Sequence, residues 1–81
     1  MFDNWEWQGE GDYYSLVGID PMGEGLNQYS VLAEIKWDVH NELYRVICYF
    51  PEWTLYVSSE NMSSILIEIV ERYLKDKGVI E

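Results

Sequence analysis

The chain has 81 residues, of which 48% are hydrophobic and 16% aromatic, and its formal net charge is −10. The aromatic content argues against a disordered acidic tail, and the length predicts one domain spanning 1–81. Residues 1–35 carry seven acids and no Lys or Arg. Direct nucleic-acid binding needs cationic side chains that displace counterions from phosphates, so the composition argues against it.

The sequence also lacks the usual signals for a membrane or an oxidising compartment. No apolar stretch approaches the roughly 20 residues of a membrane span, and residues 1–6 lack the basic and apolar parts of a secretory signal. Cys48 is the only cysteine, so no disulfide forms within the chain. We therefore expect a cytoplasmic protein without membrane contact.

The first third of the chain predicts strand and turn. Residues 1–11 form either an acidic-aromatic arm or an edge strand, because Trp5 and Trp7 are two apart and share one face of an extended segment. Residues 13–19 are expected to form a strand. Residues 20–27 contain the proline and glycines typical of a loop.

Residues 28–37 give the strongest strand signal, because apolar and polar side chains alternate over ten residues. Its expected core face contains Tyr29, Val31, Ala33, Ile35 and Trp37. Only Leu32 interrupts the polar face, which includes Glu34 and Lys36. A turn is predicted over 38–42, with Asn41 able to adopt a left-handed conformation.

Two further strands are predicted over 43–50 and 53–58, separated by Pro51, which cannot donate to a strand ladder. One face of each is expected to be buried, and these residues are Tyr44, Val46, Cys48, Phe50, Trp53, Leu55 and Val57. The opposite face carries Leu43, Arg45, Ile47, Tyr49, Thr54, Tyr56 and Ser58.

A helix is predicted over 59–78. Its expected apolar stripe contains Met62, Ile65, Leu66, Ile69, Val70, Tyr73 and Leu74. Ser58 or Ser59 can cap its start, Glu60 suits the first turn, and Gly78 favours its end. Ile67 is expected to point away from this stripe.

The order of these elements predicts the fold class. Short connections make neighbouring strands antiparallel, and the helix can bury its stripe only against one face of the sheet. We expect a two-layer α+β domain in which residues 12–58 form a three- to four-stranded antiparallel meander sheet. One C-terminal helix packs on one face of that sheet.

No motif points to catalysis or to a cofactor. His40 is the only histidine and falls in a turn without a partner nucleophile, and Cys48 falls on the expected core face. Zinc sites need four Cys or His ligands, and the 20–27 loop lacks the ligand spacing of a calcium loop. We expect no enzyme activity, no metal and no cofactor.

The aromatic residues are more informative. If the helix covers one sheet face, Arg45, Ile47, Tyr49 and Tyr56 remain uncovered, and Tyr and Arg are favoured at protein interfaces. The alternative is that Trp5 or Trp7 folds over this face and covers it.

The favoured hypothesis is a small acidic inhibitor or adaptor that captures a basic protein surface, for instance on a nucleic-acid-processing protein. The acids expected to contribute are Asp3, Glu6, Glu10, Asp12, Asp20 and Glu24. Nucleic-acid mimics, phage antagonists of host defence and toxin-immunity proteins share this composition, although that analogy identifies no family. The second hypothesis is a self-associating domain, in which two copies form a homodimer through Ile47, Tyr49 and Tyr56. The third hypothesis is a small-molecule binder.

Overall fold

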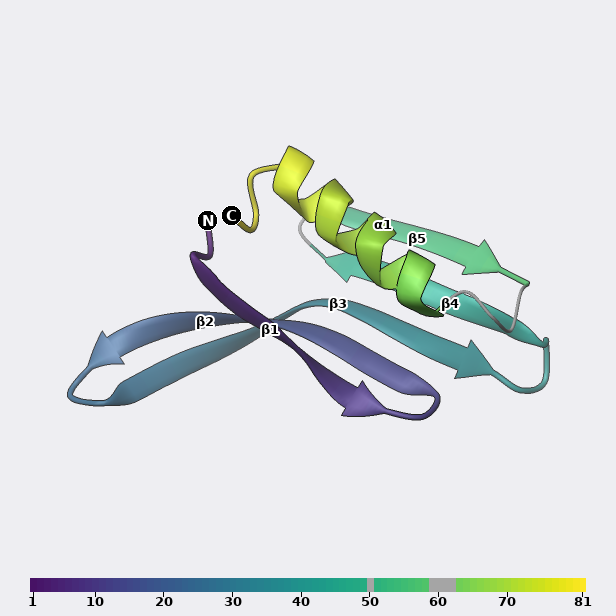
Figure 1. Ribbon diagram of the computed structural model, residues 1–81, viewed down its shortest axis with the longest axis horizontal. Coiled ribbons are helices and arrows are strands. Elements are labelled where there is room, and N and C mark those ends of the chain that lie inside the picture. Colours follow the sequence, from purple (N-terminus) through teal and green to yellow (C-terminus); the bar gives the residue numbers. More distant parts are fainter. Residues whose placement is uncertain (50, 59–62) are drawn as a thin grey trace.

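The computed structural model describes residues 1–49, 51–58 and 63–81. Five strands form one antiparallel meander sheet in the order β1-β2-β3-β4-β5, followed by one helix (Figure 1). The elements are β1 (Asn4–Glu10), β2 (Tyr13–Gly23), β3 (Leu26–Asp38), β4 (Leu43–Tyr49), β5 (Glu52–Val57) and α1 (Ser63–Asp76). The predicted α+β class is therefore confirmed. The strand count exceeds the expected three to four because residues 1–11 contain an edge strand.

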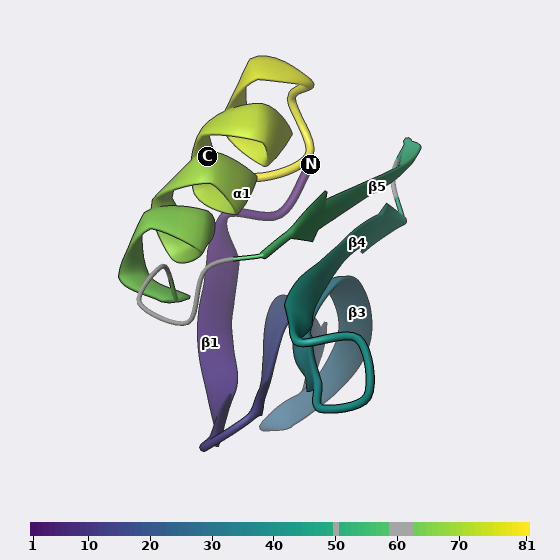
Figure 2. The ribbon, with the colours of Figure 1, turned by 90° about the vertical axis from the view of Figure 1, so that its right-hand side faces the viewer.

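Helix α1 covers one face of the sheet, which we call the covered face (Figure 2). The core lies between them and consists of Leu16, Leu32, Ala33, Ile35, Val46, Cys48, Leu66, Val70, Leu74 and Ile80. The strand residues come from β2, β3 and β4, as the alternation predicts. Trp53 of β5 stacks on Tyr73 of α1 with ring centroids 4.9 Å apart, which joins the helix to the last strand.

The helix is rotated relative to the predicted stripe. Leu66, Val70 and Leu74 are fully buried, whereas Ile65 and Ile69 are 45% and 38% exposed. Ile67, expected to point away, instead packs against the core. Ile67 lies one helical turn before Glu71. The Glu71 carboxylate accepts a hydrogen bond from Trp7 Nε1 at 2.8 Å, so the side of α1 that carries Ile67 and Glu71 faces β1. The expectation for Ile67 was wrong because the tryptophans of β1 extend the core to that side.

A bulge in β3 overturns the expectation for Tyr29 and Val31. Leu16 pairs with Ala33 and Val17 pairs with Val31, so Leu32 is an extra residue without a partner in β2. Leu32 and Ala33 are both fully buried, whereas Tyr29 and Val31 are exposed. One inserted residue transfers every earlier side chain to the opposite face. In the sequence, this bulge was indicated by Leu32, the one apolar residue that interrupts the polar face of the predicted strand.

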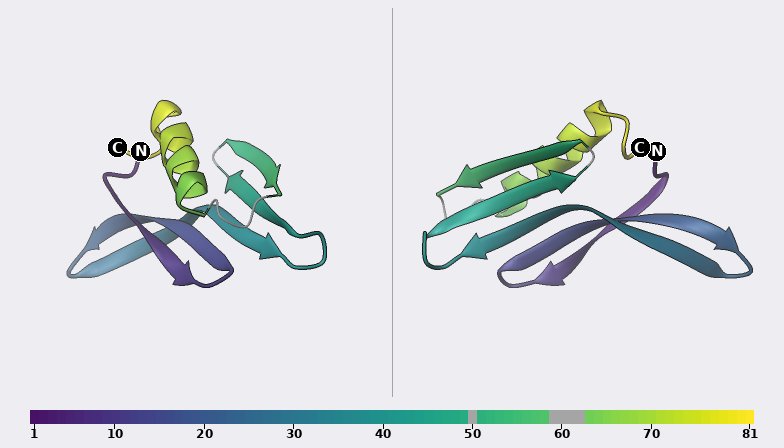
Figure 3. Two further views of the ribbon diagram at one scale, coloured as in Figure 1. Left: turned by 45° about the vertical axis from the view of Figure 1, so that its right-hand side comes forward. Right: turned by 180° about the vertical axis from the view of Figure 1, so that it is seen from behind.

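The loop predicted over 20–27 is a tight hairpin, because β2 continues to Gly23 and β3 begins at Leu26. Glu24 and Gly25 both have positive φ angles, 55° and 77°, as a two-residue turn of type I′ requires. Residues 19–29, which we call the hairpin arm, extend beyond the part of the sheet that α1 covers (Figure 3). The molecule is consequently elongated, at 44 × 24 × 18 Å.

The turn over 38–42 is present, but Glu42 rather than Asn41 has the positive φ, of 50°. The Asn41 side chain instead donates a hydrogen bond to Asp38 at 2.8 Å. This contact holds Asn41 close to the start of the turn, which leaves the left-handed position to the next residue. The prediction for Asn41 was therefore wrong.

The helix ends as predicted at glycine. Gly78 has a φ of 74°, Gly78 N–H donates to the Lys75 carbonyl, and Val79 N–H donates to the Leu74 carbonyl. These two bonds form a Schellman motif. The described helix is shorter than the predicted 59–78. Predictions for Phe50, Ser59, Glu60 and Met62 lie outside the described residues.

Residues near the two ends of the chain pair with each other, which the sequence did not predict. Phe2 N–H donates to the Val79 carbonyl at 2.8 Å, and Glu81 N–H donates to the Phe2 carbonyl at 3.2 Å. Phe2 and Ile80 thereby form a parallel bridge. The Phe2 ring lies directly over Gly18, where a Cβ atom would come within 2.6 Å of it. This contact fixes the start of β1 against β2.

Candidate functional site

The face of the sheet opposite α1 (Figure 2) is called the open face here. Strand register places the predicted aromatic residues on it. Cross-strand register places Lys36 beside Arg45 and Arg45 beside Tyr56, while Glu34 lies beside Ile47. Arg45, Ile47, Tyr49 and Tyr56 thus share this face, as their alternation predicts. Trp5 and Trp7 do not cover it, because β1 directs Trp7 to Glu71 of α1 on the other side.

A hydrogen-bonded group occupies the centre of the open face. The hydroxyls of Tyr13 and Tyr49 donate to the two carboxylate oxygens of Glu34, one to each. Lys36 Nζ lies 3.7 Å from Glu34 Oε2 and 5.5 Å from the centroid of the Tyr13 ring. We call these four residues the tyrosine–glutamate cluster. Its contacts join β2, β3 and β4, so the two tyrosine rings are held in place.

The cluster changes the acidity of its own members. Partial burial disfavours the charged form of Glu34, but hydrogen bonds from Tyr13 and Tyr49 and the nearby Lys36 outweigh it, so the pKa of Glu34 is lowered. The hydrogen bond to Glu34 raises the pKa of Tyr49 to about 12 and raises that of Tyr13 as well. Glu34 therefore stays ionised, and both hydroxyls stay protonated, across the neutral range.

Arg45 forms a second polar contact on this face. Its Nη2 atom lies 2.9 Å from Asp38 Oδ2, and its guanidinium carbon lies 6.0 Å from the centroid of the Tyr56 ring. Hydrogen bonds from Asn41 and His40 lower the pKa of Asp38, with Arg45 contributing as the neighbouring positive charge. The two bases of the open face thus each lie beside an acid, and its centre is close to electrically neutral.

The tyrosine rings of this surface are exposed to solvent. Tyr56 is 61% exposed, Tyr13 40% and Tyr49 39%. The bulge adds Val31 and, on the hairpin arm, Tyr29 to the same face. Exposed tyrosines gathered on one face are typical of interaction sites.

The six predicted acids do not form one patch. Glu10 pairs with Tyr13 in the register of β1 and β2, so Glu10 lies beside the tyrosine–glutamate cluster, and Asp12 lies in the turn that precedes Tyr13. Asp20 and Glu24 lie on the hairpin arm, at the other end of β2. A strand of 11 residues spans about 35 Å. Antiparallel strands send successive turns to opposite ends of a sheet, which sequence proximity alone does not reveal.

The two remaining acids lie on or before β1. Glu6 is exposed and accepts a hydrogen bond from Gln8 at 2.9 Å. Asp3 lies beside Glu81 near the paired ends of the chain, where its side-chain hydrogen bond and its negative charge raise the pKa of Glu81. The structure therefore brings Glu10 to the aromatic surface, with Asp12 in the adjoining turn and Glu6 on the same face of β1 as Glu10. It leaves Asp3, Asp20 and Glu24 apart from that surface.

Sequence reasoning missed three members of the central group. Tyr13, Glu34 and Lys36 come from β2 and β3, and only cross-strand register shows that they adjoin Arg45 and Tyr49. The alternation in residues 28–37 already placed Glu34 and Lys36 on a polar face. Pairing that face with the outer face of the next strand would have located the cluster.

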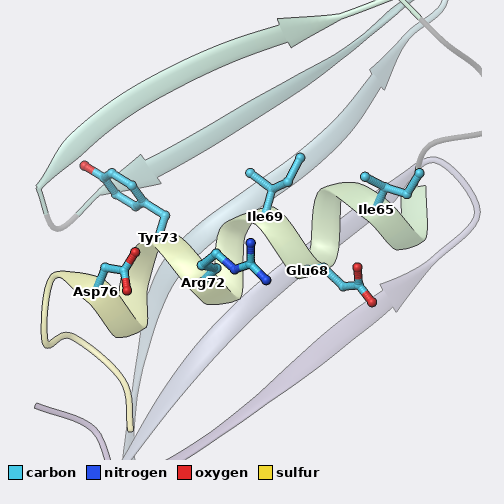
Figure 4. A pocket seen from close by; sticks show the side chains of 6 residues that line it. All are labelled: Ile65, Glu68, Ile69, Arg72, Tyr73 and Asp76. Atoms are coloured by element: carbon cyan, nitrogen blue, oxygen red, sulfur yellow. The ribbon is translucent and has the colours of Figure 1, made fainter.

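A shallow groove of about 450 Å³ lies on α1 (Figure 4). Ile65, Ile69 and Tyr73 point to one side of the helix, while Glu68 and Arg72 line the other. All the described lining residues come from this one helix, so the groove is a surface feature rather than an enclosed pocket. Its charged lining residues are Glu68, Arg72 and Asp76.

Cys48, His40 and possible metal ligands are the other groups that could take part in a reaction. Cys48 is fully buried, and desolvation raises the pKa of its thiol to about 11, which makes it unreactive at neutral pH. His40 is exposed in the β3–β4 turn, where its backbone N–H donates to Asp38. Within residues 1–49, 51–58 and 63–81, no group of three His, Cys, Asp or Glu side chains could hold a metal ion.

In the same part of the chain, no helix has the length and apolarity needed to cross a membrane. Comparisons with protein-family models, with curated proteins and with solved structures give no match for this chain.

Proposed function

We propose that this protein is a non-enzymatic binding module, acting in the cytoplasm as an inhibitor or adaptor, whose open face captures a basic protein surface. The observation that carries this proposal is the arrangement of exposed tyrosines around Glu34, on a sheet face that no described element covers. A nucleic-acid-processing protein is the first class of partner to test, because its phosphate-binding surface is cationic.

Long-range attraction brings the partner to the molecule. With a net charge of −10, the chain accelerates encounters with a positive surface, and this acceleration weakens as salt is added. Glu10 and Asp12 lie at the margin of the open face, beside Tyr13. They can therefore meet cationic side chains that surround the contact, while the neutral centre avoids burying unpaired charge.

Short-range binding then depends on the tyrosines. Each ring supplies a large amphipathic contact surface with few rotatable bonds, so little side-chain entropy is lost on binding. The hydrogen bonds of Tyr13 and Tyr49 to Glu34 reduce that loss further by holding both rings in position. Rings at the centre and charges at the margin match the usual anatomy of a protein interface.

Two matched double variants test the location of the site. Glu10→Gln with Asp12→Asn, and Asp20→Asn with Glu24→Gln, remove the same charge from opposite ends of β2. We would isolate basic interactors from the native host, purify the strongest, and measure its affinity for each variant over a salt series. The first pair should weaken binding at low salt far more than the second.

The aromatic contribution needs its own variant. Tyr49→Thr with Tyr56→Thr keeps residues that favour strands while removing two exposed rings. It should weaken binding at every salt concentration, because the lost contact does not depend on charge. Equal affinity of this variant and the unmodified protein, or affinity independent of salt, would overturn the proposal.

A further inference from the structure

The two edges of the sheet differ in how they are protected. Edge strand β1 carries Glu6 and Glu10, has Gly9 at a φ of 121°, and is preceded by the bridge between Phe2 and Ile80. Charged residues, irregular backbone and covering segments are the usual means of preventing edge-to-edge pairing. The β1 edge therefore resists association with another strand.

Edge strand β5 has almost none of these features. Between Glu52 and Val57 it contains no proline, lysine or glycine, and its pairing with β4 shows no register shift. Its sequence, Glu-Trp-Thr-Leu-Tyr-Val, is rich in residues that favour strands. No described strand pairs with its outer edge, because β5 ends the strand order of the sheet. Half of its backbone polar groups therefore point outward, ready to pair.

We propose that two copies of this chain pair antiparallel through their β5 strands, forming one continuous ten-stranded sheet. A two-fold axis at Leu55 places Trp53 opposite Val57 of the second copy, and Thr54 opposite its Tyr56. Opposed residues then lie on the same face, as an antiparallel ladder requires. Aromatic–branched pairs of this kind stabilise sheets. The one charged residue of the strand, Glu52, falls opposite Ser58, so no like charges meet.

The self-complementarity of this strand is the reason for choosing a second copy over an unrelated peptide. Repulsion between two chains of net charge −10 opposes the pairing, and salt screens that repulsion. Self-association should therefore strengthen with salt, whereas capture of a basic partner weakens. This opposite dependence separates the dimer from the proposed function, and either can fail without the other.

Multi-angle light scattering coupled to size-exclusion chromatography tests the pairing. At high protein concentration and high salt, the unmodified chain should reach twice its monomer mass. Thr54→Lys with Tyr56→Lys puts introduced lysines opposite each other and should give a monomer. Thr54→Glu with Tyr56→Glu should do the same. An equimolar mixture of the two variants should regain the dimer, because lysine then faces glutamate.

Two further measurements keep the test decisive. Ile69→Lys places a positive charge in the α1 groove and should leave the dimer intact, whereas loss of the dimer would assign association to the helix. If circular dichroism shows that the β5 variants do not fold, hydrogen exchange of the unmodified chain provides the test instead. Amides of β5 should become more protected as concentration rises, and those of β1 should not. A monomer under all conditions, or unchanged β5 exchange, overturns the proposal.

Discussion

Adjacent residues of the same strands lie in opposite environments on the two faces of the sheet. Ile35 and Val46 are fully buried on the covered face, whereas Glu34 and Ile47, one position away, lie on the open face. The covered face is held together by apolar packing, and the open face by hydroxyl, carboxylate and cation contacts. Folding stability should therefore depend mainly on the first face.

The largest effect is expected where α1 meets the sheet. Leu66→Ala removes a fully buried side chain and should lower the free energy of unfolding by about 2–5 kcal/mol. Urea unfolding monitored by tryptophan fluorescence measures this loss. Ile65→Ala, at the exposed neighbouring position, is the control and should cost less than about 1 kcal/mol. Similar losses for both variants would contradict the assigned orientation of the helix.

A smaller loss is expected beneath the Phe2 ring. Gly18→Ala introduces a Cβ atom that would lie 2.6 Å from that ring, so the ring must move. Such overpacking typically costs about 1–3 kcal/mol. In the background of Phe2→Ala, the same change should cost much less, and thermal unfolding of the four chains of this double-mutant cycle measures the difference. Strictly additive effects would show that the ring does not occupy this position.

Glu34→Gln should change stability at neutral pH by less than about 1 kcal/mol, because the contacts of the open face are partly exposed. Its effect should appear in the titration of Tyr49, whose pKa should fall from about 12 toward the ordinary 10.0. Ultraviolet absorbance of the phenolate measures the change. An unaltered tyrosine titration in this variant would exclude the hydrogen bond to Glu34.

The raised pKa of Tyr49 also gives a pH dependence of stability. A group whose pKa is higher in the folded state contributes stability that is present below its unfolded pKa. For Tyr49 this contribution should be complete below pH 10 and lost as the pH rises to about 12. In the Glu34→Gln variant, most of this decrease in folding stability at alkaline pH should disappear. Urea unfolding at several alkaline pH values measures the difference.

The smallest effect is expected at the tip of the hairpin arm, away from the helix. Glu24 has a φ of 55°, which asparagine adopts more readily, and Asn-Gly is the favoured pair in this type of turn. Glu24→Asn should therefore stabilise the protein by roughly 0.5 kcal/mol. Thermal unfolding measures the gain, and a loss of stability would contradict the assigned turn.

Much of the fold could be predicted because its determinants are local. Alternation placed Val46 and Cys48 on the covered face, and Gly78 marked the end of the helix. The exceptions depend on distant partners. The bulge at Leu32 is defined only by the pairing of β2 with β3, and the burial of Ile67 depends on which strand lies beside the helix.

The candidate site was predicted only in part for the same reason. Arg45, Ile47, Tyr49 and Tyr56 come from two consecutive strands, so alternation alone places them together. Tyr13 and Glu34 join them through long-range pairing, which one-dimensional periodicity does not reveal.

The bridge between Phe2 and Ile80 has a consequence for synthesis of the chain. The hairpins of the sheet can form while translation continues, but Phe2 gains its pairing partners only after residues 79–81 have left the ribosome. The segment before β1 should therefore be the last part of the sheet edge to become ordered during folding.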